Sequence, residues 1–262
     1  MTVAVLYICT GRYSRFFADF YESAKKHFLK GIAEIEYFVF TDDDQISNSS
    51  DVHVIHKECQ GFPLEAVFRF KNLLAAEDMT KGFDYIYFFN SNALFIKDVN
   101  LEILPPDNKT FIGSRWTKRK PFDLPMFFPY ERNKKSTAYI PPKEETEYIY
   151  YMSGFYGAAH DTFFEKYHKL DINTQIDYNN GIIARFHDES HTNKYFRTVP
   201  CHLLPDGYCL PEEWANQAKD THIIFRNKVC IDPYFDKNRD HSLLGWIKKG
   251  VYVLTNAFKW YL

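Results

Sequence analysis

The nine residues from His187 to Tyr195, HDESHTNKY, place many reactive side chains in one short segment. Five of the nine carry a carboxylate, an imidazole or an ammonium group, and apolar residues flank the segment on both sides. Because buried charge is costly unless it is paired, this composition suits acidic and basic groups held at the edge of a packed element, beside a cleft. The alternative is a plain helix start, with Asp188 or Ser190 as the N-cap and the other side chains on the surface.

A second polar group, Asn90-Ser91-Asn92, directly follows the apolar run 85–89. An amide oxygen can ligate a hard cation but brings no charge, so these residues predict weak affinity for Mg²⁺ or Mn²⁺. As donors, the same amides can hydrogen-bond phosphate or sugar oxygens directly. The alternative is that Asn90 and Asn92 only cap a turn.

Strand-like and helix-like segments alternate along the chain and determine where these polar groups lie. Apolar runs predict strands at residues 3–8, 35–40, 52–55, 85–89, 148–159 and 222–226, and helical spacing predicts helices at 16–28, 64–76 and 161–170. The alternation predicts an α/β fold with a Rossmann-like open mixed sheet, mostly parallel and flanked by helices. Ligands of such sheets bind beyond the carboxyl ends of the strands, where residues 9–13 and 90–92 fall.

Composition indicates a globular protein and argues against several classes. The 262 residues are 45% hydrophobic and 18% aromatic, which is typical of a packed chain, and a net charge of −2 argues against nucleic-acid binding. Five cysteines without a CxxC pair are expected to be reduced thiols in a cytoplasmic protein. Cys201, His202 and Cys209 lack a fourth zinc ligand. No leader-like segment opens the chain, and no run approaches the roughly 20 apolar residues of a membrane span.

The chain has no linker rich in glycine and serine, so we expect one domain over residues 1–240. The tail, residues 241–262, is apolar and aromatic and carries Lys248, Lys249 and Lys259. Two interpretations of the tail are open. It can be a helix packed on the domain, or a basic amphipathic segment that lies on the inner face of a membrane.

Together with Asn90-Ser91-Asn92, the HDESHTNKY run resembles glycosyltransferase family 6. This family contains the blood-group A and B transferases and the α-1,3-galactosyltransferases, and the chain is most similar to its soluble bacterial members. The resemblance extends to about residue 230 and includes ESAKKHF (22–28), YFVFTD (37–42), YER (130–132), STAYIP (136–141), YYMSGFYG (150–157) and NGI (180–182).

The resemblance implies a GT-A fold and retaining transfer of galactose or N-acetylgalactosamine from a UDP-sugar to O3 of a galactose. Three departures from the family pattern matter. The family's metal-binding DVD is replaced by Asn90-Ser91-Asn92, so no divalent metal or other cofactor is expected. The tryptophan before HDE is Phe186, and the family's HPGFY acceptor loop has no clear counterpart near Lys120 and Pro121.

The resemblance also assigns roles near the reacting sugar. Glu189 matches the family's active-site glutamate, and a carboxylate beneath an anomeric carbon can stabilise an oxocarbenium-like centre or attack it. Asp188 matches an aspartate that hydrogen-bonds the donor sugar, and Arg69 lies on the helix that delivers an arginine to that sugar. Phe186 and Glu189 are expected to contact the acceptor as well.

The nucleotide is expected to contact two loops. Ile8, Cys9 and Tyr13 align with the family's loop that holds uracil and ribose by backbone contacts and one tyrosine, with a plain strand-to-helix turn as the alternative. Asn90 and Asn92 are expected to bind oxygens of the diphosphate or the donor sugar.

Positive charge is expected near the diphosphate, because the leaving UDP gains negative charge and no tightly bound metal is expected to offset it. In the family, a basic C-terminal segment folds over the diphosphate. The cationic residues in this region are Arg226, Lys228, Lys237 and Arg239, and Lys228 is the first candidate for contact with the diphosphate. A solvated basic tail is the alternative.

Met152 and Gly154 align with two positions that set donor choice in the family. Glycine there accompanies N-acetylgalactosamine, since a missing methyl leaves room for an acetamido group, whereas methionine accompanies galactose but is flexible. The sequence therefore predicts a metal-independent retaining α-1,3-N-acetylgalactosaminyltransferase. Its expected acceptor is an α-1,2-fucosylated β-galactoside of an oligosaccharide or glycolipid. The alternatives are α-1,3-galactosyl transfer from UDP-galactose and a sugar- or UDP-binding module without catalysis.

Overall fold

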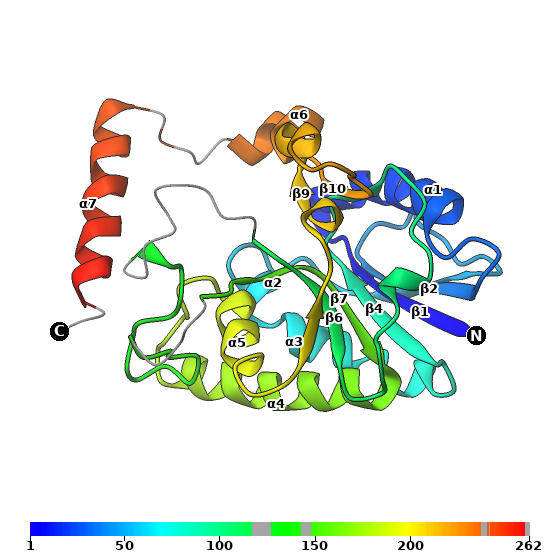
Figure 1. Ribbon diagram of the computed structural model, residues 1–262. Helices are drawn as coiled ribbons and strands as arrows, with labels where there is room; N and C mark the ends of the chain where they lie inside the picture. The colour runs from blue at the N-terminus through cyan, green and yellow to red at the C-terminus, as the bar shows by residue number, and fades with distance from the viewer. Residues whose placement is uncertain (117–126, 143–147, 237–239, 241, 260–262) are drawn as a thin grey trace.

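The computed structural model describes residues 1–116, 127–142, 148–236, 240 and 242–259. In this part of the chain, the main sheet has seven strands in the order β3-β2-β1-β4-β7-β6-β8 (Figure 1). In that order they span Val52–His56, Glu34–Thr41, Thr2–Ile8, Tyr85–Phe89, Tyr151–Ala159, Phe111–Arg115 and Cys201–Leu203. β1 pairs in parallel with β2 and β4, whereas β7 runs antiparallel to β4 and β6, so the predicted mixed sheet is confirmed.

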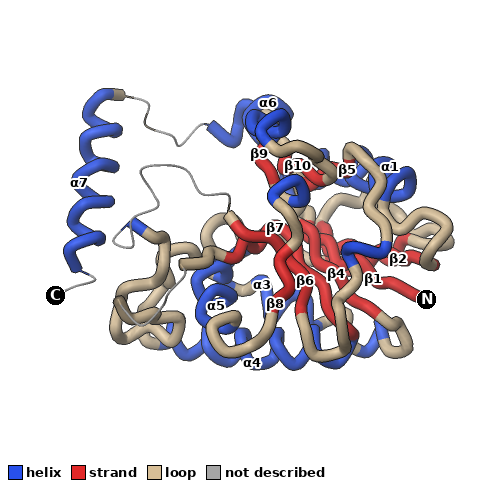
Figure 2. Tube along the Cα trace, in the orientation of Figure 1, coloured by secondary structure: helices blue, strands red, loops and turns tan. Residues whose placement is uncertain are grey.

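Helices cover both faces of this sheet (Figure 2). One face packs against α1 (Phe17–His27) and a small sheet of β5 (Ala93–Phe95), β10 (Ile223–Phe225) and β9 (Leu210–Pro211). The other face packs against α3 (Arg69–Leu74), α4 (His160–Asn179) and α5 (Asp188–Tyr195). Two single-turn helices, α2 (Leu64–Val67) and α6 (Lys228–Ile231), flank the carboxyl ends of the parallel strands.

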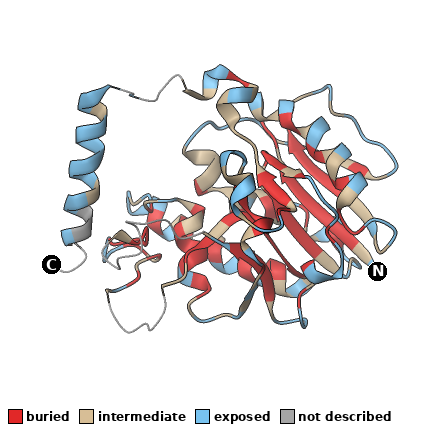
Figure 3. Cartoon of the chain, turned by 45° about the horizontal axis from the view of Figure 1, so that its top comes forward, coloured by how far each residue is buried: buried red, intermediate tan, exposed pale blue. Residues whose placement is uncertain are grey.

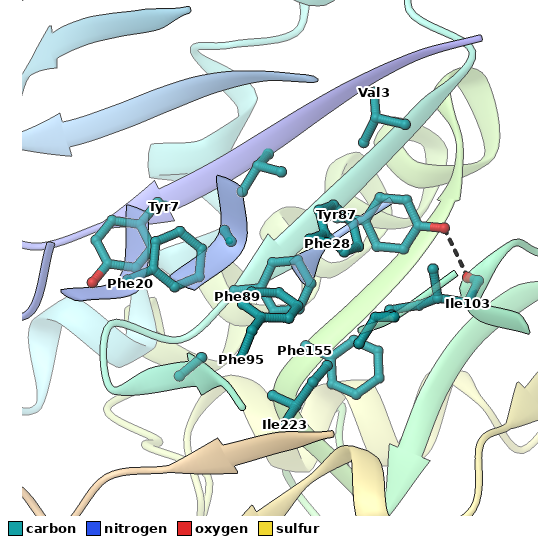
Figure 4. Close-up of a cluster of buried hydrophobic side chains, with 14 of the residues drawn as sticks. Val3, Tyr7, Phe20, Phe28, Tyr87, Phe89, Phe95, Ile103, Phe155 and Ile223 are labelled. Carbon is teal, nitrogen blue, oxygen red and sulfur yellow. Dashed lines mark hydrogen bonds between the residues drawn. The ribbon is translucent and has the colours of Figure 1, made fainter. Parts of the chain in front are cut away.

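The central strands are apolar on both faces because both faces are covered. In β1, Val3, Val5 and Tyr7 belong to the core on the α1 side, whereas Ala4 and Leu6 belong to the core on the α4 side. This alternation follows from the two-residue period of a strand. Figure 4 shows the α1-side core, where the buried tyrosine of β4, Tyr87, donates a 2.8 Å hydrogen bond to the carbonyl of Ile103.

The structure differs from the predicted elements in several places. The predicted helix 64–76 is two short helices, α2 and α3, interrupted at Phe68, where ψ is +17°. The predicted helix 161–170 continues to Asn179. Strands β5, β6, β8 and β9 were not predicted, because runs of two to five residues that gain their stability from tertiary pairing carry little local signal.

The tail forms α7 (Leu243–Lys259), which stands apart from the sheet and its helices (Figures 1 and 3). Its apolar side chains are largely exposed, including Leu243 at 77% and Trp246 at 63%. The interpretation of the tail as a helix packed on the domain is therefore wrong. Within the described residues, no helix is both long and apolar enough to cross a bilayer.

Candidate active site

The Glu189 carboxylate, at the start of α5, is held by three hydrogen bonds. The Tyr150 hydroxyl donates to Oε1 at 2.6 Å, while the backbone amide and the hydroxyl of Ser153 donate to Oε2 at 2.8 and 2.9 Å. Both oxygens are thus engaged by the strand end next to α5. A carboxylate fixed in this way is preorganised to face developing positive charge without reorienting.

Asp188, the preceding residue, forms a buried ion pair with Arg69 of α3. Arg69 Nη1 lies 2.6 Å from Asp188 Oδ2, and the two side chains are only 16% and 5% exposed. The guanidinium also lies over the ring of Phe88, with Cζ 4.9 Å from the ring centroid. The fold therefore brings together two predicted donor-sugar residues that are 119 positions apart.

Burial controls the protonation of both carboxyl groups. It raises the pKa of Glu189 above its ordinary value, although the hydrogen bonds from Ser153 and Tyr150 act in the opposite direction. Burial also raises the pKa of Asp188, and the positive charge of Arg69 offsets only part of that effect. Both groups consequently take up protons at a higher pH than exposed carboxylates do.

The turn before α5 is not capped by a side chain, so the prediction of Asp188 or Ser190 as N-cap is wrong. The N-cap position is His187, whose φ of +50° lies in the left-handed region that non-glycine residues rarely adopt. The Asp188 carboxylate bonds to Arg69 instead, and Ser190 Oγ accepts a hydrogen bond from the amide of Phe186. Such backbone strain often accompanies functional sites, and here it lies next to Asp188 and Glu189.

Other polar residues of the run are structural. Asn193 Oδ1 accepts a hydrogen bond from the backbone amide of Tyr151, and Asn193 Nδ2 donates hydrogen bonds to the carbonyls of Tyr151 and Glu189, each at 2.9 Å. His191 is 3% exposed, with Nε2 3.7 Å from Asp177 Oδ2. These buried contacts lock α5 onto β7 and α4, which leaves Asp188 and Glu189 as the pair presented toward the strand ends.

A cavity of about 250 Å³ lies at the carboxyl ends of β1 and β4. Five residues predicted to bind the donor line it: Ile8, Tyr13, Arg69, Asn90 and Lys228. Thr10, Ser91 and Glu65 line it too and were not predicted. Asp188 and Glu189 do not line this cavity, but Asp188 is paired with Arg69, which does.

Three predicted donor residues lie elsewhere. The Cys9 side chain is fully buried in the core, while its amide bonds to Phe40 and its carbonyl accepts the hydroxyl of Thr41. The Arg226 guanidinium is paired with Asp19 of α1. The Asn92 side chain is buried and donates to the carbonyl of Arg226 at 2.8 Å. The structure does not bring the side chains of these three residues into the cavity.

The amides of Asn90 and Asn92 bond to each other, with Asn90 Nδ2 donating to Asn92 Oδ1 at 2.9 Å. An oxygen already occupied in this way, on a neutral group, is a poor match for a divalent cation that prefers several charged oxygen ligands. In the described part of the chain, no cluster of three or more His, Cys, Asp or Glu side chains could hold a metal. The donor set thus does not fit a tight Mg²⁺ or Mn²⁺ site.

Lys228 supplies positive charge at the cavity. Its Nζ lies 3.2 Å from the hydroxyl of Tyr13 and 4.8 Å from the centroid of that ring. An ammonium group beside a nucleotide-sized cavity is suited to a phosphate. Lys237 and Arg239, also predicted for this role, lie outside the described residues, as do Lys120 and Pro121.

The two predicted specificity positions lie on β7. Met152 packs against the α1-side core. A Cβ added to Gly154 would come within 2.5 Å of Cζ of Phe225 in β10, so the glycine accommodates this ring. The space that the sequence prediction assigned to an acetamido group is therefore occupied by Phe225. The carbonyl of Gly154 accepts the amide of Asn90 at 2.7 Å, which ties this position to the cavity wall.

The predicted acceptor residue Phe186 is 37% exposed and lies edge-on to Tyr150, with ring centroids 6.2 Å apart. Because Tyr150 binds Glu189, this ring lies at the outer side of the fixed carboxylate. Tyr150 and Ser153 were not assigned roles from the sequence. Both lie in the quoted YYMSGFYG segment, whose hydroxyl groups beside glycine were the available signal.

Comparisons with known proteins agree with this arrangement. The model of glycosyltransferase family 6 matches residues 1–230. The O-antigen biosynthesis glycosyltransferase WbnI of Escherichia coli is 32% identical over 230 residues, which is 87% of this chain and 95% of WbnI. The globoside α-1,3-N-acetylgalactosaminyltransferase 1 of Gallus gallus is 31% identical, covering 79% of this chain and 61% of its own length.

The histo-blood group ABO system transferase 1 of Rattus norvegicus is 29% identical, covering 74% of this chain and 56% of its own length. The chain thus spans less than two thirds of these vertebrate relatives and nearly all of WbnI. The family match extends from the first strand to α6 and includes all the residues that line the cavity. On this match and on its identity to WbnI, the chain belongs to glycosyltransferase family 6.

Proposed function

We propose that the protein is a retaining α-1,3-N-acetylgalactosaminyltransferase. In this proposal it transfers the sugar of UDP-GalNAc to O3 of a β-galactoside, which is α-1,2-fucosylated. The observation that carries the proposal is the Glu189 carboxylate, held by Tyr150 and Ser153 next to the Asp188–Arg69 pair, whose arginine lines a cavity of about 250 Å³.

In the proposed reaction, the bond from the anomeric carbon to the diphosphate oxygen breaks and a bond to the acceptor oxygen forms on the same face of the sugar. The proton of the acceptor hydroxyl passes to the leaving diphosphate, so UDP and the glycoside are the products. Positive charge develops on the anomeric carbon, and Glu189 stabilises it or attacks it to form a covalent intermediate. Asp188 and Arg69 hold hydroxyl groups of the donor sugar. Phe186 provides an apolar surface for the acceptor, because flat aromatic rings suit sugar faces.

We further propose that no divalent metal is needed. The neutral amides of Asn90 and Asn92 support this, since they bond to each other and bring no charge. The leaving UDP must then be stabilised by side chains, and Lys228, which lines the cavity beside Tyr13, is in position to do so. Lys237 and Arg239 are further candidates for this role from the sequence.

Two positions on β7, Met152 and Gly154, bear on the choice of donor sugar. The glycine at position 154 favours N-acetylgalactosamine by resemblance to the family. One of the relatives named above is also called an N-acetylgalactosaminyltransferase. The ring of Phe225 beside Gly154 weakens the simple volume argument. Transfer of galactose from UDP-galactose is therefore the second candidate, favoured by Met152.

A panel of donors and acceptors tests the proposal. The full chain is incubated with UDP-GalNAc or UDP-galactose and with galactosides that carry or lack an α-1,2-fucose, and the product linkage is determined by NMR. The proposal expects an α-1,3-linked N-acetylgalactosamine on the fucosylated acceptor. A higher kcat/KM for UDP-galactose would favour the second candidate. UDP-sugar binding with neither transfer nor hydrolysis would identify a binding module.

A further inference from the structure

The helix α7 carries an apolar face that the described part of the protein does not cover. At 100° per residue, six of its apolar side chains fall within an arc of about 100°. They are Leu243, Leu244, Ile247, Val251, Leu254 and Phe258, and each is between 50% and 77% exposed. One continuous strip of large apolar side chains therefore faces solvent along the whole helix.

The contact between α7 and the domain lies on another side of the helix. Tyr252 falls about 130° from the centre of the apolar arc, and the Arg185 guanidinium carbon lies 5.8 Å from the centroid of its ring. The apolar strip consequently lies on a different side of the helix from this contact, and its side chains are exposed. It is available to a partner without any rearrangement of the fold.

The charge of α7 has one sign. Residues 243–259 contain Lys248, Lys249 and Lys259 and no aspartate or glutamate. Lys248 falls about 40° beyond the edge of the apolar arc, where a long side chain can bury its stem and keep its ammonium in water. Trp246 is 63% exposed, with Lys249 Nζ 5.5 Å from its ring centroid. Lysine and tryptophan at the margin of an apolar face are typical of helices that lie in the interface of a bilayer.

We propose that α7 docks the protein on the surface of an anionic bilayer. The helix would lie in the membrane plane, with its apolar strip among the acyl chains and its lysines at the anionic headgroups. Such docking would keep the site described above close to acceptors carried by lipids. The absence of acidic side chains in residues 243–259 favours anionic lipid over a second copy of α7, since two copies would bring lysines together without an acidic partner on either helix.

The same features argue against α7 crossing the bilayer. Its 17 residues span about 26 Å at 1.5 Å per residue, less than the roughly 30 Å of a hydrocarbon core. Lys248 and Lys249 would also lie within that core, where charge is costly. An orientation in the plane of the interface is compatible with the length of the helix and keeps its lysines in water.

Sedimentation of the full chain with vesicles tests the proposal. Vesicles of phosphatidylcholine are compared with vesicles that also contain phosphatidylglycerol, at low and high salt. We expect binding to the anionic vesicles that weakens with salt and is much weaker on neutral vesicles. The double variant Lys248→Glu/Lys249→Glu should lower the partition coefficient at least about tenfold. Ile247→Ser/Leu254→Ser should lower it about a hundredfold.

Matched variants on other surfaces separate these effects from general changes in charge or apolar area. Lys26→Glu/Lys30→Glu changes the net charge equally, and Leu101→Ser/Ile172→Ser removes equally exposed apolar side chains. Both should bind vesicles like the unaltered protein. Transfer to a soluble acceptor should be unchanged in the α7 variants, so loss of docking can be told apart from loss of the proposed catalytic function.

Three results would overturn the proposal. The first is an absence of binding to anionic vesicles. The second is equal loss of binding in the α7 variants and in their matched controls. The third is a lipid-free dimer, seen by light scattering, that the α7 variants dissociate while vesicles fail to recruit the protein; this would assign the apolar strip to a second copy of the chain.

Discussion

The helices α5 and α7 invert the usual relation between side-chain chemistry and burial. In α5, Asp188 is 3% exposed and His191 and Asn193 are equally buried, although the segment is among the most polar of the chain. In α7, apolar side chains such as Leu243 are more than half exposed. Polar groups are buried only where partners satisfy them, and large apolar strips stay exposed only where something else covers them. Both exceptions therefore point to a function.

The two helices differ in where the partners of these unusual side chains lie. The carboxylates of α5 find their partners inside the molecule, in Arg69, Tyr150 and Ser153. The apolar strip of α7 has no comparable cover in the described residues, and in the docking proposal its partner is an anionic bilayer. Substitutions in α5 should accordingly change catalysis and the stability of the fold, whereas substitutions in α7 should change only the binding of the protein to membranes.

Glu189→Gln should cause the largest effect of the substitutions considered. The amide keeps the shape of the side chain but removes the charge that faces the anomeric carbon in the proposed reaction, so UDP-sugar binding should persist while kcat falls about 10²–10³-fold. Steady-state kinetics and calorimetric titration with the UDP-sugar measure the two effects. An unaltered kcat would remove Glu189 from the mechanism and would leave α5 as a purely structural helix.

Arg69→Met should destabilise the fold by about 3–5 kcal/mol, because it leaves Asp188 buried without its partner. Without Arg69, the already raised pKa of Asp188 should rise further, so the variant loses stability as the pH climbs above the ordinary range of an aspartate. The stability difference from the unaltered protein should thus shrink in acid. Urea unfolding at several pH values tests this, and a constant difference would show that Asp188 is not the cause.

These expectations depend on contacts that sequence could supply only in part. The strands β1 and β4 were predicted almost to the residue, because both are continuous apolar runs ended by polar turns. The functional interpretation of the Asp188 and Glu189 region came from the unusual mixture of charge and apolar flanks. The partners of Glu189 could not be inferred, since the contact of Ser153 with α5 depends on how β7 packs and not on local pattern.

Other predictions failed for the same reason. Arg226 was expected at the diphosphate because it is cationic and lies in the expected region, yet Asp19 of α1 neutralises it. Gly154 was interpreted as empty space, but its missing methyl makes room for Phe225, 71 positions later in the chain. Long-range neighbours of this kind leave no trace in spacing or composition.

Gly154→Ala should change donor selectivity by about 10–200-fold, the range expected for one methyl group in a sugar pocket. The added Cβ would displace the ring of Phe225, so the substitution changes the position of this ring as well as adding a methyl group. We expect the preference for UDP-GalNAc over UDP-galactose to narrow or reverse, measured as a ratio of kcat/KM values. The variant Gly154→Ala/Phe225→Leu separates the two causes: selectivity that returns in it would assign the effect to Phe225.

Tyr150→Phe should give the smallest effect, a change in the pH profile. The unaltered kcat/KM should fall in acid with an apparent pKa above 4.5, because burial raises the pKa of Glu189 and the ionised form is the active one. The Tyr150 hydrogen bond lowers that pKa, so its removal should move the acid limb to higher pH. A limb that stays in place, or moves to lower pH, would show that a different group controls the acid side.

The initial rate of sugar transfer from UDP-GalNAc to a fucosylated galactoside, measured in excess EDTA, tests the central claim most directly. The account predicts that the rate in EDTA equals the rate without chelator and that added Mn²⁺ does not raise it, because Asn90 and Asn92 offer only neutral amides bonded to each other. Complete loss of transfer in EDTA, restored by Mn²⁺, would contradict it.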